Sequence, residues 1–280
     1  MLLTGTHACA DEKPGKKKSS GGTFEDNHGI QWTEGPATLP VGGQAQIKLP
    51  EGYMGTGPEG TKKILELNQN PADGSDLALV TPTGGLDWWM VFSFDDCGYV
   101  KDDEKAELDA GAILSSLREG IEAGNLQRKS RGWETLTLVG WEVEPKYNTD
   151  THNLEWATRV TSKTGASINY NCRVLGRHGV MRVNLVCSPE ALAESLPDFQ
   201  KVLTGFSYVG GQGYAEFRSG DKVAEYGLTA LIAGGTVAAG LKLGIIQKLW
   251  KFIVVGVVAL IAGFKKVIAR ILGRGGEATR

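Results

Sequence analysis

The chain has little of the chemistry that marks common active sites. Among its 280 residues there are only four cysteines and four histidines. No Cys-x-x-Cys, His-Glu-x-x-His or Gly-x-Ser-x-Gly pattern occurs, so the usual zinc sites and nucleophile elbows are not indicated. Gly55, Gly57 and Gly60 match a dinucleotide-binding pattern, but Pro58 interrupts it and no parallel strand-helix-strand unit follows. We therefore expect no metal and no cofactor.

Acidic residues outnumber basic ones over most of the chain, and basic residues outnumber acidic ones at its C-terminal end. The net charge is −2 overall and +7 over residues 242–280, which leaves about −9 for the residues before them. Nucleic-acid binding would require a basic patch on the folded body itself. The charge pattern instead predicts a membrane surface as a partner and no nucleic acid.

Two apolar runs precede the basic end. Residues 226–246 contain one charge, Lys242, and residues 252–264 contain none. Because a membrane-spanning helix needs about 20 apolar residues, residues 226–264 are predicted to be a membrane segment of one or two helices, after a junction at residues 214–225. The positive-inside rule favours one crossing, with the basic tail at residues 265–280 on the cytoplasmic side.

The N-terminus resembles the end of a secretory signal peptide. Residues 8–10, Ala-Cys-Ala, form a small-residue cleavage pattern, but only residues 1–3 supply apolar sequence, against the ~7–15 residues required. Residues 1–10 are therefore interpreted as a signal-peptide remnant whose true start lies upstream. The alternatives are a disordered N-terminus without a function and a lipoprotein acylated at Cys9. Residues 11–27 are predicted to be a flexible linker. The body, residues 28–213, would then be extracytoplasmic.

The body shows a clear strand pattern over residues 154–187. A tight turn at residues 177–178 predicts a hairpin with one apolar face. A second turn, between residues 162 and 166, is predicted to add a third strand whose apolar residues lie on the same face. Residues 135–143 add a fourth strand. The predicted apolar face comprises Leu154, Trp156, Val160, Ile168, Tyr170, Cys172, Val174, Met181, Val183, Leu185 and Cys187; the opposite, solvated face carries Asn169, Asn171, Arg173, Arg182 and Asn184.

Helices and a buried strand complete the predicted body. Residues 86–95 are almost wholly apolar, as in a strand buried on both faces. Asp109 is predicted to cap a helix that ends near Gly124, and a second helix is predicted to begin at Pro189 and to kink or restart at Pro197. Since strands and helices segregate along the chain, we predict an α+β fold, an antiparallel meander sheet packed by helices.

The stretch at residues 93–110 holds seven carboxylates. Its acids can end a strand and cap the next helix, bind an ion or a partner, or perform acid/base catalysis; capping is favoured. Gly98 and Tyr99 are predicted to set the conformation of the turn. The candidate acids are Asp95, Asp96, Asp102, Asp103 and Glu104.

Two stretches, the first made of two neighbouring strings, carry a resemblance to a known family. "GYVKDDEK" at residues 98–105, "DAGAILSSLREG" at residues 109–120 and "YAEFRSGDKVAEYGLTALIAGG" at residues 214–235 resemble the bacterial family called domain of unknown function 2167. The resemblance implies a membrane-anchored prokaryotic protein without an assigned activity, so it transfers no catalytic residue. The four-stranded meander closed by a helix is also similar to the Mog1/PsbP-like sandwich.

Two functions are compatible with these observations. The first is a non-enzymatic, membrane-anchored envelope protein whose exported body binds a protein partner or a ligand. The second is a membrane-tethered hydrolase or metal-dependent enzyme that uses the carboxylates of residues 95–104.

Overall fold

The computed structural model describes residues 22–26 and 28–233. The predicted signal-peptide remnant, most of the predicted linker, the membrane segment from residue 234 onward and the basic tail lie outside the described residues. Within the described ranges, no helix has the length and apolarity needed to cross a membrane. Thr23–Glu25, inside the predicted linker, forms a strand that pairs with Gln31–Glu34.

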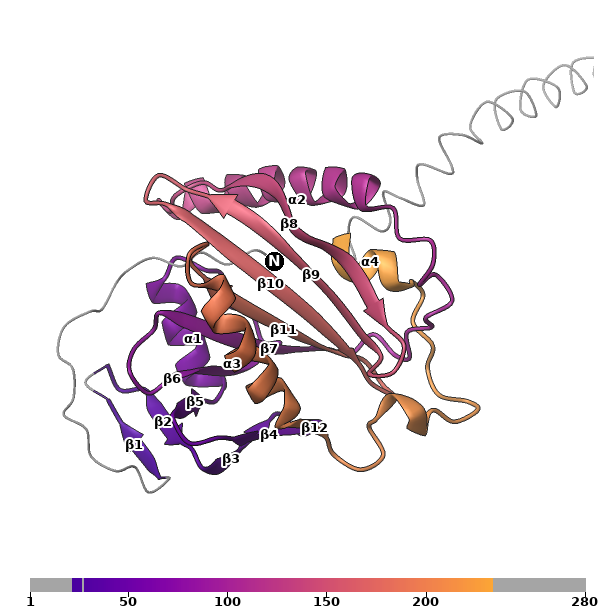
Figure 1. Cartoon of the computed structure of the whole chain (residues 1–280), viewed down its shortest axis with the longest axis horizontal. Helices are drawn as coiled ribbons and strands as arrows, with labels where there is room; N and C mark the ends of the chain where they lie inside the picture. Colours follow the sequence, from indigo (N-terminus) through magenta and orange to yellow (C-terminus); the bar gives the residue numbers. More distant parts are fainter. Residues whose placement is uncertain (1–21, 27, 234–280) are drawn as a thin grey trace, which may run out of the picture. The chain divides into compact units, whose positions relative to one another are not determined.

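Twelve strands and four α-helices are arranged along the described chain (Figure 1). The strands are β1 (Thr23–Glu25), β2 (Gln31–Glu34), β3 (Ala37–Val41), β4 (Ala45–Leu49), β5 (Tyr53–Thr56), β6 (Asp76–Pro82), β7 (Trp88–Asp95), β8 (Thr137–Asn148), β9 (Asn153–Thr161), β10 (Ala166–Leu175), β11 (Val180–Cys187) and β12 (Phe206–Tyr208). The helices are α1 (Pro58–Leu67), α2 (Ala110–Ser130), α3 (Leu192–Thr204) and α4 (Leu228–Ala233), with a 3-10 turn at Tyr214–Glu216.

The strands form a nine-stranded and a three-stranded antiparallel sheet. The large sheet has the order β1-β2-β5-β6-β7-β11-β10-β9-β8, and the small sheet has the order β12-β4-β3. The predicted α+β class with an antiparallel sheet and helices is therefore confirmed. The predicted meander corresponds to β8 to β11, which are neighbours in chain order. Because β5 and β6 pair antiparallel around α1, the glycine motif does not open a dinucleotide-binding unit.

The predicted hairpin register is confirmed. Ile168 pairs with Cys187, Cys172 with Val183, and Val174 with Met181. Cys172 and Cys187 are buried free thiols. Asp109 caps α2 as predicted, since its carboxylate accepts a hydrogen bond from the Ala112 amide at 2.9 Å.

The predicted register of the third strand is wrong. The loop at residues 162–165 pairs Ala166 with Thr161, which sets Trp156 opposite Asn171. Leu154, Trp156 and Val160 therefore share a face with the polar residues of β10. Because side chains alternate along a strand, one residue of register moves every side chain to the other face.

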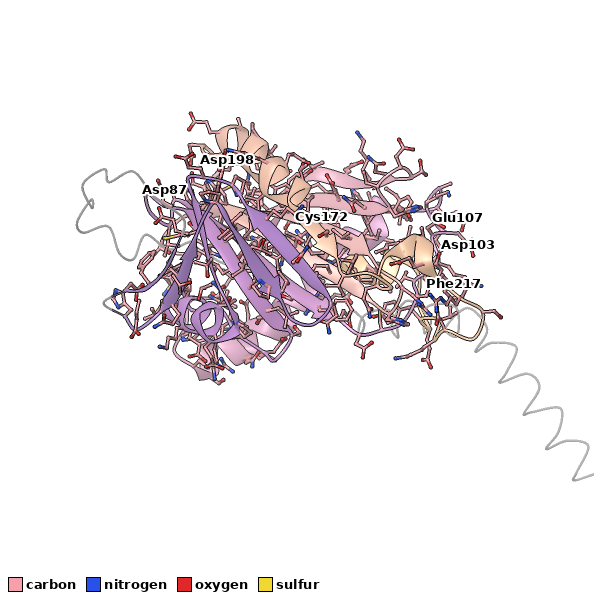
Figure 2. The ribbon with its side chains drawn as sticks, turned by 90° about the horizontal axis from the view of Figure 1, so that it is seen from below. Asp87, Asp103, Glu107, Cys172, Asp198 and Phe217 are labelled. Atoms are coloured by element: carbon pink, nitrogen blue, oxygen red, sulfur yellow. The ribbon has the colours of Figure 1, made fainter. Side chains whose placement is uncertain are left out.

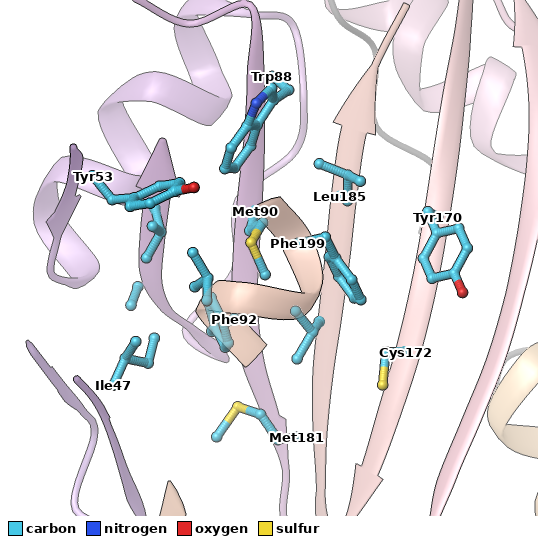
Figure 3. Packing of buried hydrophobic residues seen from close by; sticks show 14 of the residues in the cluster. Ile47, Tyr53, Trp88, Met90, Phe92, Tyr170, Cys172, Met181, Leu185 and Phe199 are labelled. Atoms are coloured by element: carbon cyan, nitrogen blue, oxygen red, sulfur yellow. The ribbon is translucent and has the colours of Figure 1, made fainter. Parts of the chain in front are cut away.

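Both faces of the large sheet are buried, which corrects the predicted solvated face. One face packs on α3 and the small sheet around Phe92, Met90 and Phe199 (Figure 3). The opposite face packs on α1 at one end and on α2 and α4 at the other. Between those two clusters Asn169 and Asn171 are nearly inaccessible.

Strand β7 is a central strand buried on both faces, as predicted. Two helix boundaries differ from the sequence predictions. Helix α2 continues through Gly124 to Ser130. Helix α3 begins at Leu192, after a turn in which the Ser188 hydroxyl accepts from the Ala191 amide at 3.2 Å, and it continues across Pro197.

Candidate functional site

The acidic stretch connects β7 to α2 and contains a constrained glycine. Gly98 has φ of 95°, and its amide donates to the His178 carbonyl at 2.9 Å. A Cβ atom at Gly98 would lie 2.7 Å from the Lys222 carbonyl oxygen. Only glycine combines this backbone conformation with this close approach.

Tyr99 joins the stretch to the C-terminal part of the body. Its amide donates to the Lys222 carbonyl at 2.8 Å, and its carbonyl accepts from the Ala224 amide at 2.9 Å. Its ring stacks on Tyr214 at 4.5 Å and lies 4.3 Å from the ring of Phe217. The motif at residues 98–105 therefore packs directly on the motif at residues 214–235; we call this contact the junction.

An ion pair strengthens the junction. The Arg177 guanidinium donates twice to the Asp221 carboxylate, each time at 2.7 Å. Because the arginine stabilises the ionised form, the pKa of Asp221 lies well below its usual range. Arg177 belongs to the turn between β10 and β11, so the ion pair connects residues 218–224 to the large sheet.

The candidate carboxylates do not share a partner. Asp95 accepts from the Tyr226 hydroxyl at 3.2 Å, and Glu104 accepts from the Thr229 amide at 3.4 Å in the first turn of α4. Asp102 forms an ion pair with Lys105 at 3.4 Å. Asp96 and Asp103 are exposed. Figure 2 shows Asp103 and Glu107 near Phe217, at the end of the body away from Asp87.

These contacts are those of a structural connection. In the described part of the chain, no three acidic, histidine or cysteine side chains gather as a metal site would require. Burial, followed by the nearby Asp102 carboxylate, raises the pKa of Tyr147. Burial also raises the pKa of the Cys97 thiol, which disfavours the reactive thiolate.

A second feature lies on the large sheet between the two apolar clusters. We call it the polar strip: Asn169, Asn171, Arg173, Arg182 and Asn184. Arg173 pairs directly with Arg182 across β10 and β11, and Asn171 pairs with Asn184. The sequence reasoning named these residues but predicted that they are solvated.

Arg173 is the most buried charged member of the strip. Its side chain is 4% exposed, and its guanidinium lies 4.6 Å from the centre of the Trp156 ring. Its Nη1 donates to the Asn184 side chain at 3.1 Å and to the Cys172 carbonyl at 3.3 Å. Its Nε has no hydrogen-bond partner. The one sequence signal for this burial is an arginine in the middle of a strand of the predicted meander, whose neighbours are mostly apolar.

These features define the chain as an α+β body whose two most specific sequence motifs form one junction. A model of a family described as "Protein of unknown function (DUF2167)" matches residues 33–265. The chain belongs to this family. The resemblance seen in the sequence motifs is thereby confirmed.

The other comparisons add little. No curated protein matches the chain. Among solved structures, it is similar to the solution structure of PsbP (CyanoP) from Synechocystis sp. PCC 6803, with 12% sequence identity and a TM-score of 0.39. The match covers 71% of this chain and 98% of that chain. A match at this level carries no argument about function, and the Mog1/PsbP-like assignment stays a prediction.

Proposed function

We propose that the chain is a membrane-anchored envelope protein whose extracytoplasmic body binds a protein partner or a ligand without catalysing a reaction. The observation that carries the proposal is the junction. The motif after the central strand β7 and the motif at residues 214–235 are joined by backbone hydrogen bonds and aromatic stacking, and an ion pair connects the second motif to the turn between β10 and β11.

Such a junction suits a body held at a membrane. Glu104 lies against the first turn of α4, and Leu228, Leu231 and Ile232 pack in the same cluster as Trp156. The described chain therefore packs on the body up to Ala233, which includes residues 226–233, the first part of the predicted membrane segment.

The alternative, a hydrolase or metal-dependent enzyme using residues 95–104, gains no support from the described geometry. Paired carboxylates that act as acid and base must converge on one substrate. Here Asp95, Asp102 and Glu104 have different partners.

Cell fractionation tests the proposal. A tag on the chain expressed from its own locus should appear in the membrane fraction, and protease added outside the inner membrane should degrade the body. A matched variant that ends after residue 233 should leave the membrane fraction while keeping the fold of the body. Recovery of the full chain as a soluble cytoplasmic protein would refute the proposal.

A further inference from the structure

We infer that the polar strip binds an oxyanion, the carboxylate or phosphate group of a ligand, between Arg173 and Arg182. This inference deepens the binding role proposed above and rests on it; it does not depend on the membrane anchor. The juxtaposition that carries it is a directly opposed pair of arginines on neighbouring central strands.

The two arginines carry like charge without a matching carboxylate. Within residues 22–26 and 28–233, neither Arg173 nor Arg182 forms an ion pair, and the Nε atom of each is buried without a hydrogen-bond partner. Burial lowers the pKa of Arg173, and the charge of Arg182 lowers it further. A buried cation beside a second cation is costly unless an anion compensates both.

The nearest acids have other partners. Asp76 accepts from the Ser93 hydroxyl at 2.7 Å and from the Asp73 amide at 2.9 Å. Asp73 accepts from the Ser75 amide at 2.8 Å, and Asp95 accepts from Tyr226. Arg182 contacts these acids only indirectly, because its Nη2 donates to the Ser75 hydroxyl at 2.6 Å. Asp73 and Asp95 therefore act on the arginines at longer range, through charge alone.

Further orphan polar atoms lie on the same face of the sheet. Trp89 Nε1 and Thr158 Oγ1 are buried without a partner. Trp89 pairs with Val186, and Thr158 pairs with Asn169. Both residues therefore lie in the same row of directly paired residues across the strands as Asn169. Buried polar groups in folded proteins are nearly always satisfied, so these two atoms call for a polar partner, water or ligand, on this face of the sheet.

The strip offers suitable chemistry and access. Arg182 and Asn184 are half-buried, so the strip is open to solvent along β11. Guanidinium groups bind carboxylate and phosphate oxygens through charge-assisted hydrogen bonds. The side-chain amide of Asn184 supplies a neutral donor, and the Trp156 ring, stacked on Arg173, supplies an apolar wall. A small organic anion with an apolar part matches this arrangement.

Isothermal titration calorimetry on the full-length chain in mild detergent tests the inference. Potassium phosphate and sodium acetate are titrated separately at constant ionic strength, with chloride as the balancing anion. We expect saturable binding of at least one probe, and the tighter of the two identifies the headgroup as phosphate or carboxylate. Arg173→Met, which removes the charge and keeps a long side chain, should weaken that binding at least about tenfold.

The matched control is Arg159→Met, which removes an arginine whose ion pair with Glu142 lies outside the strip. It should keep wild-type affinity. If Arg173→Met does not fold, Arg182→Met carries the same test. Absence of binding of both probes to wild type, or equal loss in the Arg159 control, would overturn the inference. Neither result depends on fractionation, so failure here is distinguishable from failure of the proposed anchoring.

Discussion

Replacement of Gly98 by alanine tests whether the junction depends on this glycine. The new Cβ atom would lie 2.7 Å from the Lys222 carbonyl oxygen, and the residue would have to keep φ of 95°. The same carbonyl oxygen accepts the Tyr99 amide hydrogen bond. The substitution therefore strains the backbone and disturbs the contact that joins the two motifs.

The expected magnitude follows from these two effects. A non-glycine residue in this conformation costs about 1–3 kcal/mol, and each backbone hydrogen bond of Tyr99 that is lost costs about 0.5–1.5 kcal/mol. We expect Gly98→Ala to lower the free energy of unfolding by roughly 2–4 kcal/mol. Urea unfolding followed by tryptophan fluorescence measures this change.

Limited trypsin digestion shows where the effect lies. Release of residues 214–224 should accelerate cleavage at Arg218 and Lys222. The control is Gly120→Ala, a helical position at which a Cβ atom meets nothing within 4 Å, and which should gain about 0.5–1 kcal/mol. Wild-type stability of Gly98→Ala together with wild-type resistance to trypsin would show that the glycine is not required.

Two further predictions concern the same junction. Tyr99→Leu removes the ring contacts with Tyr214 and Phe217, worth about 0.5–1.5 kcal/mol each, and should lower the urea midpoint; an unchanged midpoint would show that the stacking contributes nothing. Asp221→Asn removes the charged partner of Arg177. Because the pKa of Asp221 in the folded protein lies below the ordinary 3.8, the ion pair stabilises the fold above pH 3.8, and this stabilisation is lost as the pH falls below that value. The difference in Tm between wild type and this variant should therefore be constant from about pH 5 to 8 and shrink in acid; a pH-independent difference would contradict the ion-pair argument.

The fold was predictable where short-range rules apply. The glycines around residues 177–178 fix the β10–β11 register, and Asp109 marks the start of α2. The β9–β10 register was not predictable in the same way, because residues 162–165 allow turns of more than one length. The four-residue loop places Trp156 beside Asn171 and creates the mixed face.

The site was predictable only in part. Gly98 and Tyr99 were singled out in the sequence as residues of the turn, and in the structure Gly98 has a positive φ and Tyr99 is held by two backbone hydrogen bonds. Their contact with Lys222 joins residues more than a hundred positions apart, which no local pattern shows. Arginine and asparagine alternating with apolar residues normally indicate a solvated face, so the burial of Arg173 depends on helices packed over the sheet and could not be read from β10 alone.

The junction also determines how the body would carry mechanical force. Residues 222–224 hydrogen-bond to Tyr99, directly after β7, and Asp221 holds the turn between β10 and β11. These strands lie in the interior of the nine-stranded sheet. Once α4 is detached, tension applied at residue 225 would therefore be delivered to interior strands, each of which has neighbours on both sides.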